Sequence, residues 1–277
     1  MSIFQILLPA FVASLILTGI HAYLGVHVVE RGVIFVDLSL AQIAALGTTV
    51  AYLAGYDLHS DTAYLFSLGF TFLGAAIFAM SRSHSRKTRI PQEAIIGIVY
   101  AVSAAVAILV MSKATQETEH LKEMLVGNIL SVSWMELLKT AVLYALVGFF
   151  HYLFRRRFLL ISMNEAEAER QGLNIRFWDF LFYMSFGFVV TSSVAIAGVL
   201  LVFCFLIVPS VTAMLFTERL GPRLAIGWTM GAFVSALGVY LSYLWDLPTG
   251  ATIVGTFGAG LLVVAGYRRA FRPAAAA

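Results

Sequence analysis

Long apolar stretches separated by short polar segments make up most of the chain, and the polar segments hold most of the charged residues. Because about 20 apolar residues are needed to cross a bilayer as a helix, each stretch predicts one transmembrane span. The pattern therefore predicts an all-α, polytopic membrane helical bundle of about eight or nine transmembrane helices, eight if one segment is re-entrant. We expect a single transmembrane domain over residues 1–270 and a short C-terminal tail over 271–277. The predicted spans are 4–26, 33–54, 62–80, 94–112, 135–153, 178–193, 196–217, 224–244 and 249–267.

The longest stretch runs from Phe180 to Thr217 and holds 38 residues without Asp, Glu, Lys, Arg or His. Its length predicts two crossings joined by a tight turn, which we place at Thr191–Ser193, the small polar cluster near its middle. The second crossing contains Pro209 and Ser210, and a break there is tolerated only where protein or water satisfies the freed backbone groups. This helix is either kinked and packed in a bundle or lines a transport path, and the pattern alone does not choose.

Composition narrows the class of protein. With 277 residues, 60% of them hydrophobic and 12% charged, and a positive mean hydropathy, the chain leaves no room for a separate soluble catalytic domain. Its single cysteine, Cys204, lies inside a predicted span and excludes a disulfide framework. We do not expect Met1–Leu24 to be a cleaved signal peptide, since it lacks a basic start and is apolar for too long. The small net positive charge fits membrane topology better than nucleic-acid binding.

The basic residues predict the orientation in the membrane, because Lys and Arg gather in short cytoplasmic loops. The predicted spans place 15 of the 18 basic residues on one side. Only Lys113, Lys122 and Lys139 fall on the other side. We therefore expect a multi-pass protein of the cytoplasmic (inner) membrane, in contact with lipid, with its N-terminus outside and its C-terminus inside.

The second predicted span carries the main candidate chemistry. Asp37 is a carboxylate in or near the membrane, which is costly unless it faces a polar interior, and Ser39 and Gln42 follow it. On a regular helix Gln42 is rotated about 140° from Asp37, so these polar groups form one stripe only if the helix is locally unwound. Asp37 is either an oxygen ligand or gate in a cation path, or the partner of a basic residue or helix end at the cytoplasmic mouth.

Just past the first span, His27 and Glu30 stand three residues apart and share a helix face, as a two-ligand metal site requires. Residues near the end of a span also reach toward the interface or pair with a neighbour. Arg31, directly beside Glu30, is one such neighbour.

The longest segment on the basic side, Arg155–Phe177, contains a short charged helix. Asn164 is placed to cap the helix EAEAERQ, and Gly172 is placed to end it. A short, charged, exposed helix has no core of its own, so it indicates either a cytoplasmic partner or a solvated connector.

Several motifs are absent. The sequence has no GxxxxGK[ST] phosphate loop and no HExxH or GxSxG motif, so it shows no apparatus for ATP binding or hydrolysis within the membrane. A multi-span protein without its own energy source is a channel, a secondary carrier or the membrane half of a pump. The charged helix after Asn164 favours the last of these.

Five segments occur in this order along the chain: GVHVVERGVIFVDLSLAQIAALG, QEAIIGIVYAVSAAVAIL, LKEMLVGNILSVS, NEAEAERQGLN and GVLLVFCFLIVPSVTA. Together they resemble the permease (transmembrane) subunits of the ATP-binding-cassette (ABC) transporter family for zinc, manganese and iron ions. The resemblance implies a homodimer without a permanently bound cofactor, which moves a divalent metal ion or its complex. It also implies a separate ATPase subunit that binds ATP and an extracytoplasmic substrate-binding protein. The coupling residues would be Asn164, Glu165, Ala166, Glu167, Ala168, Glu169, Arg170 and Gly172.

The resemblance also implies a metal-contacting role for Asp37, with Ser39 and Gln42 beside it and His27 and Glu30 as secondary candidates. The family's second helix usually carries His four residues after this Asp, where the present chain has Ala41. Without that imidazole the site is built from oxygen ligands, which suit manganese or iron better than tightly bound zinc. The site would equally handle a metal chelate or let a weakly held ion pass. The competing hypotheses are a self-sufficient ion-coupled carrier that uses Asp37 as a cation or proton site, and a non-transporting scaffold.

Overall fold

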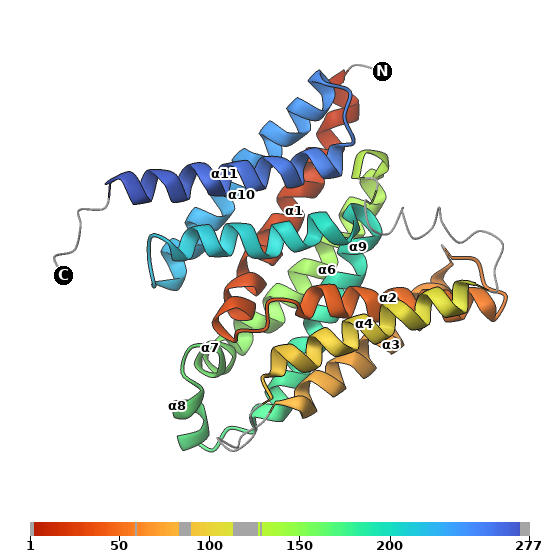
Figure 1. The fold of residues 1–277 in the computed structure, drawn as a ribbon, viewed down its shortest axis with the longest axis vertical. Helices are drawn as coiled ribbons and strands as arrows, with labels where there is room; N and C mark the ends of the chain where they lie inside the picture. Colours follow the sequence, from red (N-terminus) through yellow and green to blue (C-terminus); the bar gives the residue numbers. More distant parts are fainter. Residues whose placement is uncertain (1–2, 59, 83–89, 113–126, 128, 272–277) are drawn as a thin grey trace. The chain divides into compact units, whose positions relative to one another are not determined.

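The computed structural model describes residues 3–271, apart from 59, 83–89, 113–126 and 128 (Figure 1). The described residues contain helices and no strands, which confirms the predicted all-α class. Eight of the helices are long and apolar enough to cross a membrane. The elements are α1 (Ile3–Glu30), α2 (Val36–Leu53), α3 (Asp61–Ser81), α4 (Gln92–Met111), the 3-10 helix η1 (Ile129–Ser131), α6 (Trp134–Leu153), α7 (Arg155–Met163), α8 (Glu165–Arg170), α9 (Ile175–Met214), α10 (Leu220–Leu244) and α11 (Thr249–Phe271).

The chain forms two compact units, each made of segments that are distant in sequence. The first unit contains residues 1–26, 128–139 and 200–277, and the second contains 27–127 and 140–199. The expectation of one transmembrane domain over residues 1–270 stays a prediction. Residues 272–277, which cover nearly all of the expected tail, lie outside the described part of the chain.

The predicted turn at Thr191–Ser193 is wrong. These residues are helical within α9, whose 40 residues depart from helical backbone angles at Gly198 alone (φ 74°, ψ 161°). The hydroxyl of Ser192 donates to the carbonyl of Phe188 at 2.9 Å, so this polar side chain is satisfied one turn back without breaking the helix. The break falls at Gly198 because only glycine readily adopts its backbone angles.

The helix continues through Pro209, and α1 packs against this part of α9 within the first unit. The hydroxyl of Ser210 donates to the carbonyl of Leu206 at 2.8 Å and to that of Ala22, in α1, at 3.2 Å. Gly25 in α1 lies so close to α9 that a Cβ on it would be 2.0 Å from the carbonyl oxygen of Leu206. A neighbouring helix thus supplies the protein surroundings that the sequence required for this proline.

The rest of the first unit places α1, α10 and α11 in contact. The indole Nε1 of Trp228 in α10 donates to the carbonyl of Gly19 in α1 at 3.0 Å. The rings of Phe205 and Phe257 meet edge to face, with centroids 5.5 Å apart, and join α9 to α11. Helices α10 and α11 pack against each other, and they cross in the view of Figure 1.

In the second unit, α2 packs against both α3 and α4 (Figure 1). Gly47 brings α2 close to the backbone of α3, since a Cβ there would be 2.7 Å from the carbonyl oxygen of Phe66. The hydroxyls of Thr71 and Thr191 lie 3.3 Å apart and link α3 to α9. Most of α2, which carries Asp37, is buried by this packing.

Candidate functional site: a buried ion-pair network beside a short charged helix

Helix α8 has the ends that its sequence predicts. The side-chain oxygen of Asn164 accepts the backbone N–H of Glu167 at 3.0 Å and so caps the first turn. At the other end Gly172 has φ +70°, and the N–H of Leu173 donates to the carbonyl of Ala168 at 3.1 Å. Ala168 is fully buried, whereas Ala166, Glu169 and Arg170 are exposed. One face of α8 is thus fixed on the protein and the other is open.

Helix α7 is anchored by aromatic side chains. Phe158 is fully buried and its ring stacks on that of His151, with centroids 4.4 Å apart. Trp178, at the start of α9, meets the Phe158 ring edge to face at 5.6 Å. The imidazole Nε2 of His151 lies 2.9 Å from the hydroxyl of Ser185, so α6, α7 and α9 are joined here.

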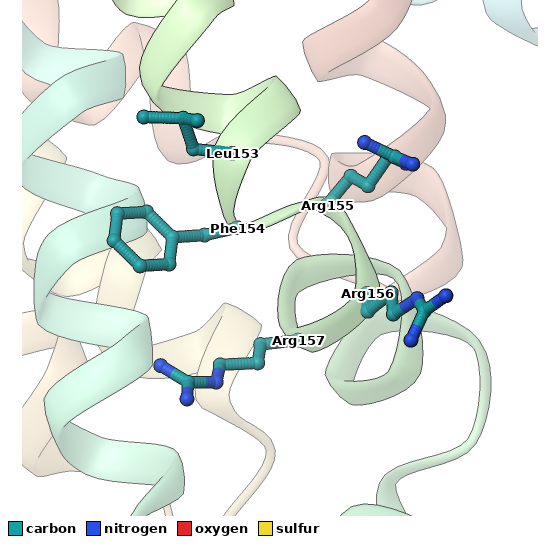
Figure 2. Close-up of a pocket in the computed structure, with 5 residues that line it drawn as sticks. All are labelled: Leu153, Phe154, Arg155, Arg156 and Arg157. Carbon is teal, nitrogen blue, oxygen red and sulfur yellow. The ribbon is translucent and has the colours of Figure 1, made fainter.

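A hollow of about 360 Å³ lies at the turn from α6 to α7 and is lined by Leu153, Phe154, Arg155, Arg156 and Arg157 (Figure 2). The guanidinium of Arg157 lies over the ring of Trp178 at 4.7 Å, and that of Arg155 lies over the ring of Tyr152 at 4.4 Å. Three adjacent guanidinium groups repel a metal cation. This hollow is therefore not a candidate metal site.

Among the described residues of the second unit, a cluster of buried charge surrounds Asp179. This carboxylate is fully buried, and each of its oxygens pairs with a different arginine. Arg31, which follows α1, approaches one oxygen at 2.6 Å, and Arg82, which follows α3, approaches the other at 2.6 Å. Charged groups this deeply buried persist only when they are paired.

Both arginines also contact the corner between α7 and α8. Arg82 donates from Nε to Glu165 at 3.0 Å, and its Nη2 lies 3.0 Å from the other oxygen of the same carboxylate. Arg31 donates from Nε to the hydroxyl of Ser162 at 2.8 Å. Burial alone would lower the pKa of Arg82, but the carboxylates of Asp179 and Glu165 outweigh burial and raise that pKa above its ordinary value. The guanidinium therefore stays charged.

The two secondary candidates, His27 and Glu30, have different surroundings. His27 is buried and its Nδ1 lies 2.8 Å from the hydroxyl of Ser162, in α7. Glu30 is half-buried. Arg31, the residue next to Glu30, forms an ion pair with Asp179.

Asp37 is buried in the first turn of α2, where one carboxylate oxygen accepts the N–H of Leu38 at 2.8 Å. The ion pairs of the described residues do not include it. Ser39 donates its hydroxyl to the carbonyl of Ile96 at 3.2 Å, and Gln42 is half-buried. The part of the chain that the structure describes contains no group of three His, Cys, Asp or Glu side chains placed to hold a metal ion. A metal-contacting role for these residues stays a prediction.

Sequence reasoning did not single out Asp179 or Arg82. The available signal was that Asp179 is the only acidic residue between Glu169 and Glu218, at the edge of the long uncharged stretch. A solitary carboxylate at the edge of an apolar span requires a cationic partner. The sequence offered many arginines for this role and did not indicate which ones would reach it.

Long apolar helices in two compact units, with a short charged helix fixed beside a buried ion-pair network, are the features expected of the membrane subunit of a transporter. The chain belongs to the ABC 3 transport family, whose model matches residues 3–267. It is the membrane-spanning permease subunit of an ATP-binding-cassette transporter, which confirms the resemblance seen in the sequence.

Curated relatives agree with this assignment, and solved structures share the fold. The chain is 27% identical over 260 residues to the manganese transport system membrane protein MntC of Listeria monocytogenes, covering 91% of this chain and 86% of the relative. It is 29% identical over 251 residues to a probable iron transport system membrane protein of Haemophilus influenzae, covering 91% and 89%. The fold is similar to a chain of PsaBC from Streptococcus pneumoniae in complex with Fab (TM-score 0.76, 24% identity, 95% and 91% covered). It is also similar to an inward-facing putative metal-chelate type ABC transporter (TM-score 0.71, 23% identity, 96% and 89% covered).

Proposed function

We propose that this permease imports a divalent metal ion, manganese or iron in preference to zinc, or a complex of such an ion. The observation that carries the proposal is the family match over residues 3–267, together with relatives named for manganese and iron transport. The chain would work as a homodimer, and an extracytoplasmic binding protein would deliver the ion. ATP would be hydrolysed on a separate ATPase subunit, so the permease itself would not be an enzyme.

The orientation follows from charge. The arginines around α7 and α8 belong to the side that holds 15 of the 18 basic residues, and this side would be cytoplasmic. The N-terminus would then lie outside the cytoplasmic membrane and the C-terminus inside. In this orientation the exposed face of α8 points to the compartment that contains the ATPase, and residues 164–172 would form the coupling segment.

Asp37 is the residue proposed to contact the passing ion. It is buried, and it carries an oxygen donor of the kind that manganese and iron accept. Ala41 stands where the family's imidazole usually lies, which weakens the case for zinc. Ser39 already donates to Ile96, and His27 already contacts Ser162, so we rank both below Asp37 as ligands. Water molecules and the second copy of the chain would supply the remaining donors.

Reconstitution tests the proposal. The permease would be purified with and without its ATPase and placed in lipid vesicles, and uptake of radioactive manganese would be followed with ATP on the ATPase side. We expect uptake only when ATPase, ATP and binding protein are all present. Uptake by the permease alone, driven by an ion gradient, would instead establish the self-sufficient carrier. Absence of flux with every component present would favour the non-transporting scaffold.

A further inference from the structure

We propose that Arg82 is a positioning residue that transmits movement of α8 to the membrane helices through its salt bridges to Glu165 and Asp179. This inference rests on the proposed function, because it assumes that an ATPase acts on α8. It assigns different tasks to the glutamates of α8 and extends the coupling site from α8 to Arg82, which follows α3, and to Asp179 in α9.

The first step of the argument is that two arginines hold a four-residue corner. Residues 162–165 join α7 to α8, with Ser162 at one end of the corner and Glu165 at the other. Arg31 donates to Ser162 at 2.8 Å, and Arg82 contacts both carboxylate oxygens of Glu165 at 3.0 Å. Both arginines also pair with Asp179, each at 2.6 Å. The corner is therefore tied to residues that follow α1 and α3 and to the first turns of α9.

The second step is that the links differ in exposure. The side chain of Asp179 is 0% exposed, Arg31 is 1% exposed and Arg82 is 9% exposed, whereas Glu165 is 42% exposed. Water competes for the outer pair of Arg82 and Glu165, and it does not reach the two inner pairs to the same extent. The inner pairs thus fix the arginines to the membrane helices, and the outer pair is the one that a movement of α8 would pull on or release.

The third step is that only one of the three glutamates of α8 reaches this network. Glu167 pairs with Arg170 at 2.6 Å and accepts a hydrogen bond from Gln171 at 2.8 Å, both within or next to α8 itself. Glu169 is exposed. Of these three glutamates, Glu165 is the one that contacts Arg82. Glu169, which is exposed, is placed to contact the ATPase. Glu165 is placed to transmit movement of α8 to Arg82.

The bidentate geometry makes the contact between Arg82 and Glu165 rigid. The two oxygens of Glu165 face two nitrogens of one planar guanidinium, so the pair resists rotation as well as separation. A lysine at position 82 would keep the charge beside Asp179 and lose this fork. Substitution of Arg82 by Lys therefore weakens transmission while leaving the buried carboxylate neutralised.

The test uses the reconstituted complex of permease, ATPase and binding protein, with variants Glu165→Gln, Arg82→Lys and the two combined. Glu218→Gln is the matched control, because Glu218 is an exposed glutamate outside this network, between α9 and α10. Three quantities are measured: the amount of ATPase that co-purifies, the rate of ATP hydrolysis, and the manganese ions taken up per ATP hydrolysed.

We expect Glu165→Gln and Arg82→Lys to keep the ATPase bound and to lower uptake per ATP at least fivefold, with Glu218→Gln at the level of the unmodified protein. The double variant should be no worse than the more impaired single variant, because both changes remove the same link. An unchanged uptake per ATP in Glu165→Gln, or additive losses in the double variant, would overturn the inference. Failure of the unmodified complex to bind ATPase or to transport would instead refute the proposed function, before any variant is compared.

Discussion

The close crossing of α1 and α9 in the first unit yields a quantitative prediction for Gly25. A Cβ at this position would be 2.0 Å from the carbonyl oxygen of Leu206 and 2.3 Å from the hydroxyl oxygen of Ser210. Real Cβ atoms essentially never approach another heavy atom closer than 3.0 Å, so Gly25→Ala requires a local separation of about 1 Å. The obstructing Leu206 oxygen is backbone and cannot rotate away as a flexible side chain would.

The magnitude follows from two opposing effects. Adding a methyl group to a tightly packed interface costs roughly 1–3 kcal/mol, and a backbone obstruction places Gly25→Ala near the upper end. Alanine recovers about 0.5–1 kcal/mol, because it restricts the unfolded chain more than glycine does in a helix. The net loss in the free energy of unfolding is about 2 kcal/mol, or roughly 30-fold in the ratio of folded to unfolded protein.

Gly19→Ala is the matched control within the same helix, since a Cβ at Gly19 meets nothing within 4 Å. We expect this variant to be unchanged or more stable by up to about 1 kcal/mol. Both variants would be unfolded reversibly in mixed micelles with rising SDS, and unfolding would be followed by tryptophan fluorescence. Equal midpoints for the two variants would refute the claim that the α1–α9 crossing excludes a side chain at Gly25.

Three further predictions concern α9, α8 and α2. Gly198→Ala should lower the thermal midpoint, because its backbone angles cost alanine about 1–3 kcal/mol, whereas Gly97→Ala, in open space in α4, should not. Asn164→Ala should remove the cap of α8, worth about 1 kcal/mol, and speed hydrogen exchange at Glu167 roughly fivefold; an unchanged rate would show that the cap does not hold the first turn. Asp37→Asn should lower manganese uptake at least about tenfold with normal assembly, since an amide is a weaker ligand for a hard cation, whereas the exposed Asp61→Asn should transport normally. Normal uptake by Asp37→Asn would identify its carboxylate as a structural group at the helix end.

The sequence located the membrane helices well because each one is encoded by its own residues. Hydrophobicity over about 20 residues is sufficient to identify a span, and the spans predicted at 33–54 and 62–80 correspond to α2 and α3. Local capping is encoded in the same way, which is why Asn164 and Gly172 marked the ends of α8 before its surroundings were known. Predictions of this kind depend on neighbours within a few positions.

The position of the break in α9 was not predictable from the same information. Thr191–Ser193 is polar and glycine-free, and it remains helical because serine hydroxyls can donate to carbonyls of the preceding turn. Gly198 lies in apolar sequence without any turn signature other than the glycine itself. A polar cluster indicates a turn only when water is available to it, and Ser193 is fully buried.

The candidate site also has features that the sequence predicted and features that it did not. The sequence by itself determined the spans, the charged helix α8 and Asp37 as a carboxylate that needs an explanation. Only the tertiary structure decided that Asp179 pairs with Arg31, 148 residues away, and with Arg82, 97 residues away. The physical reason is that hydrophobicity and capping are set by residues close in sequence, whereas a buried charge is neutralised by whichever opposite charge the folded helices bring within reach.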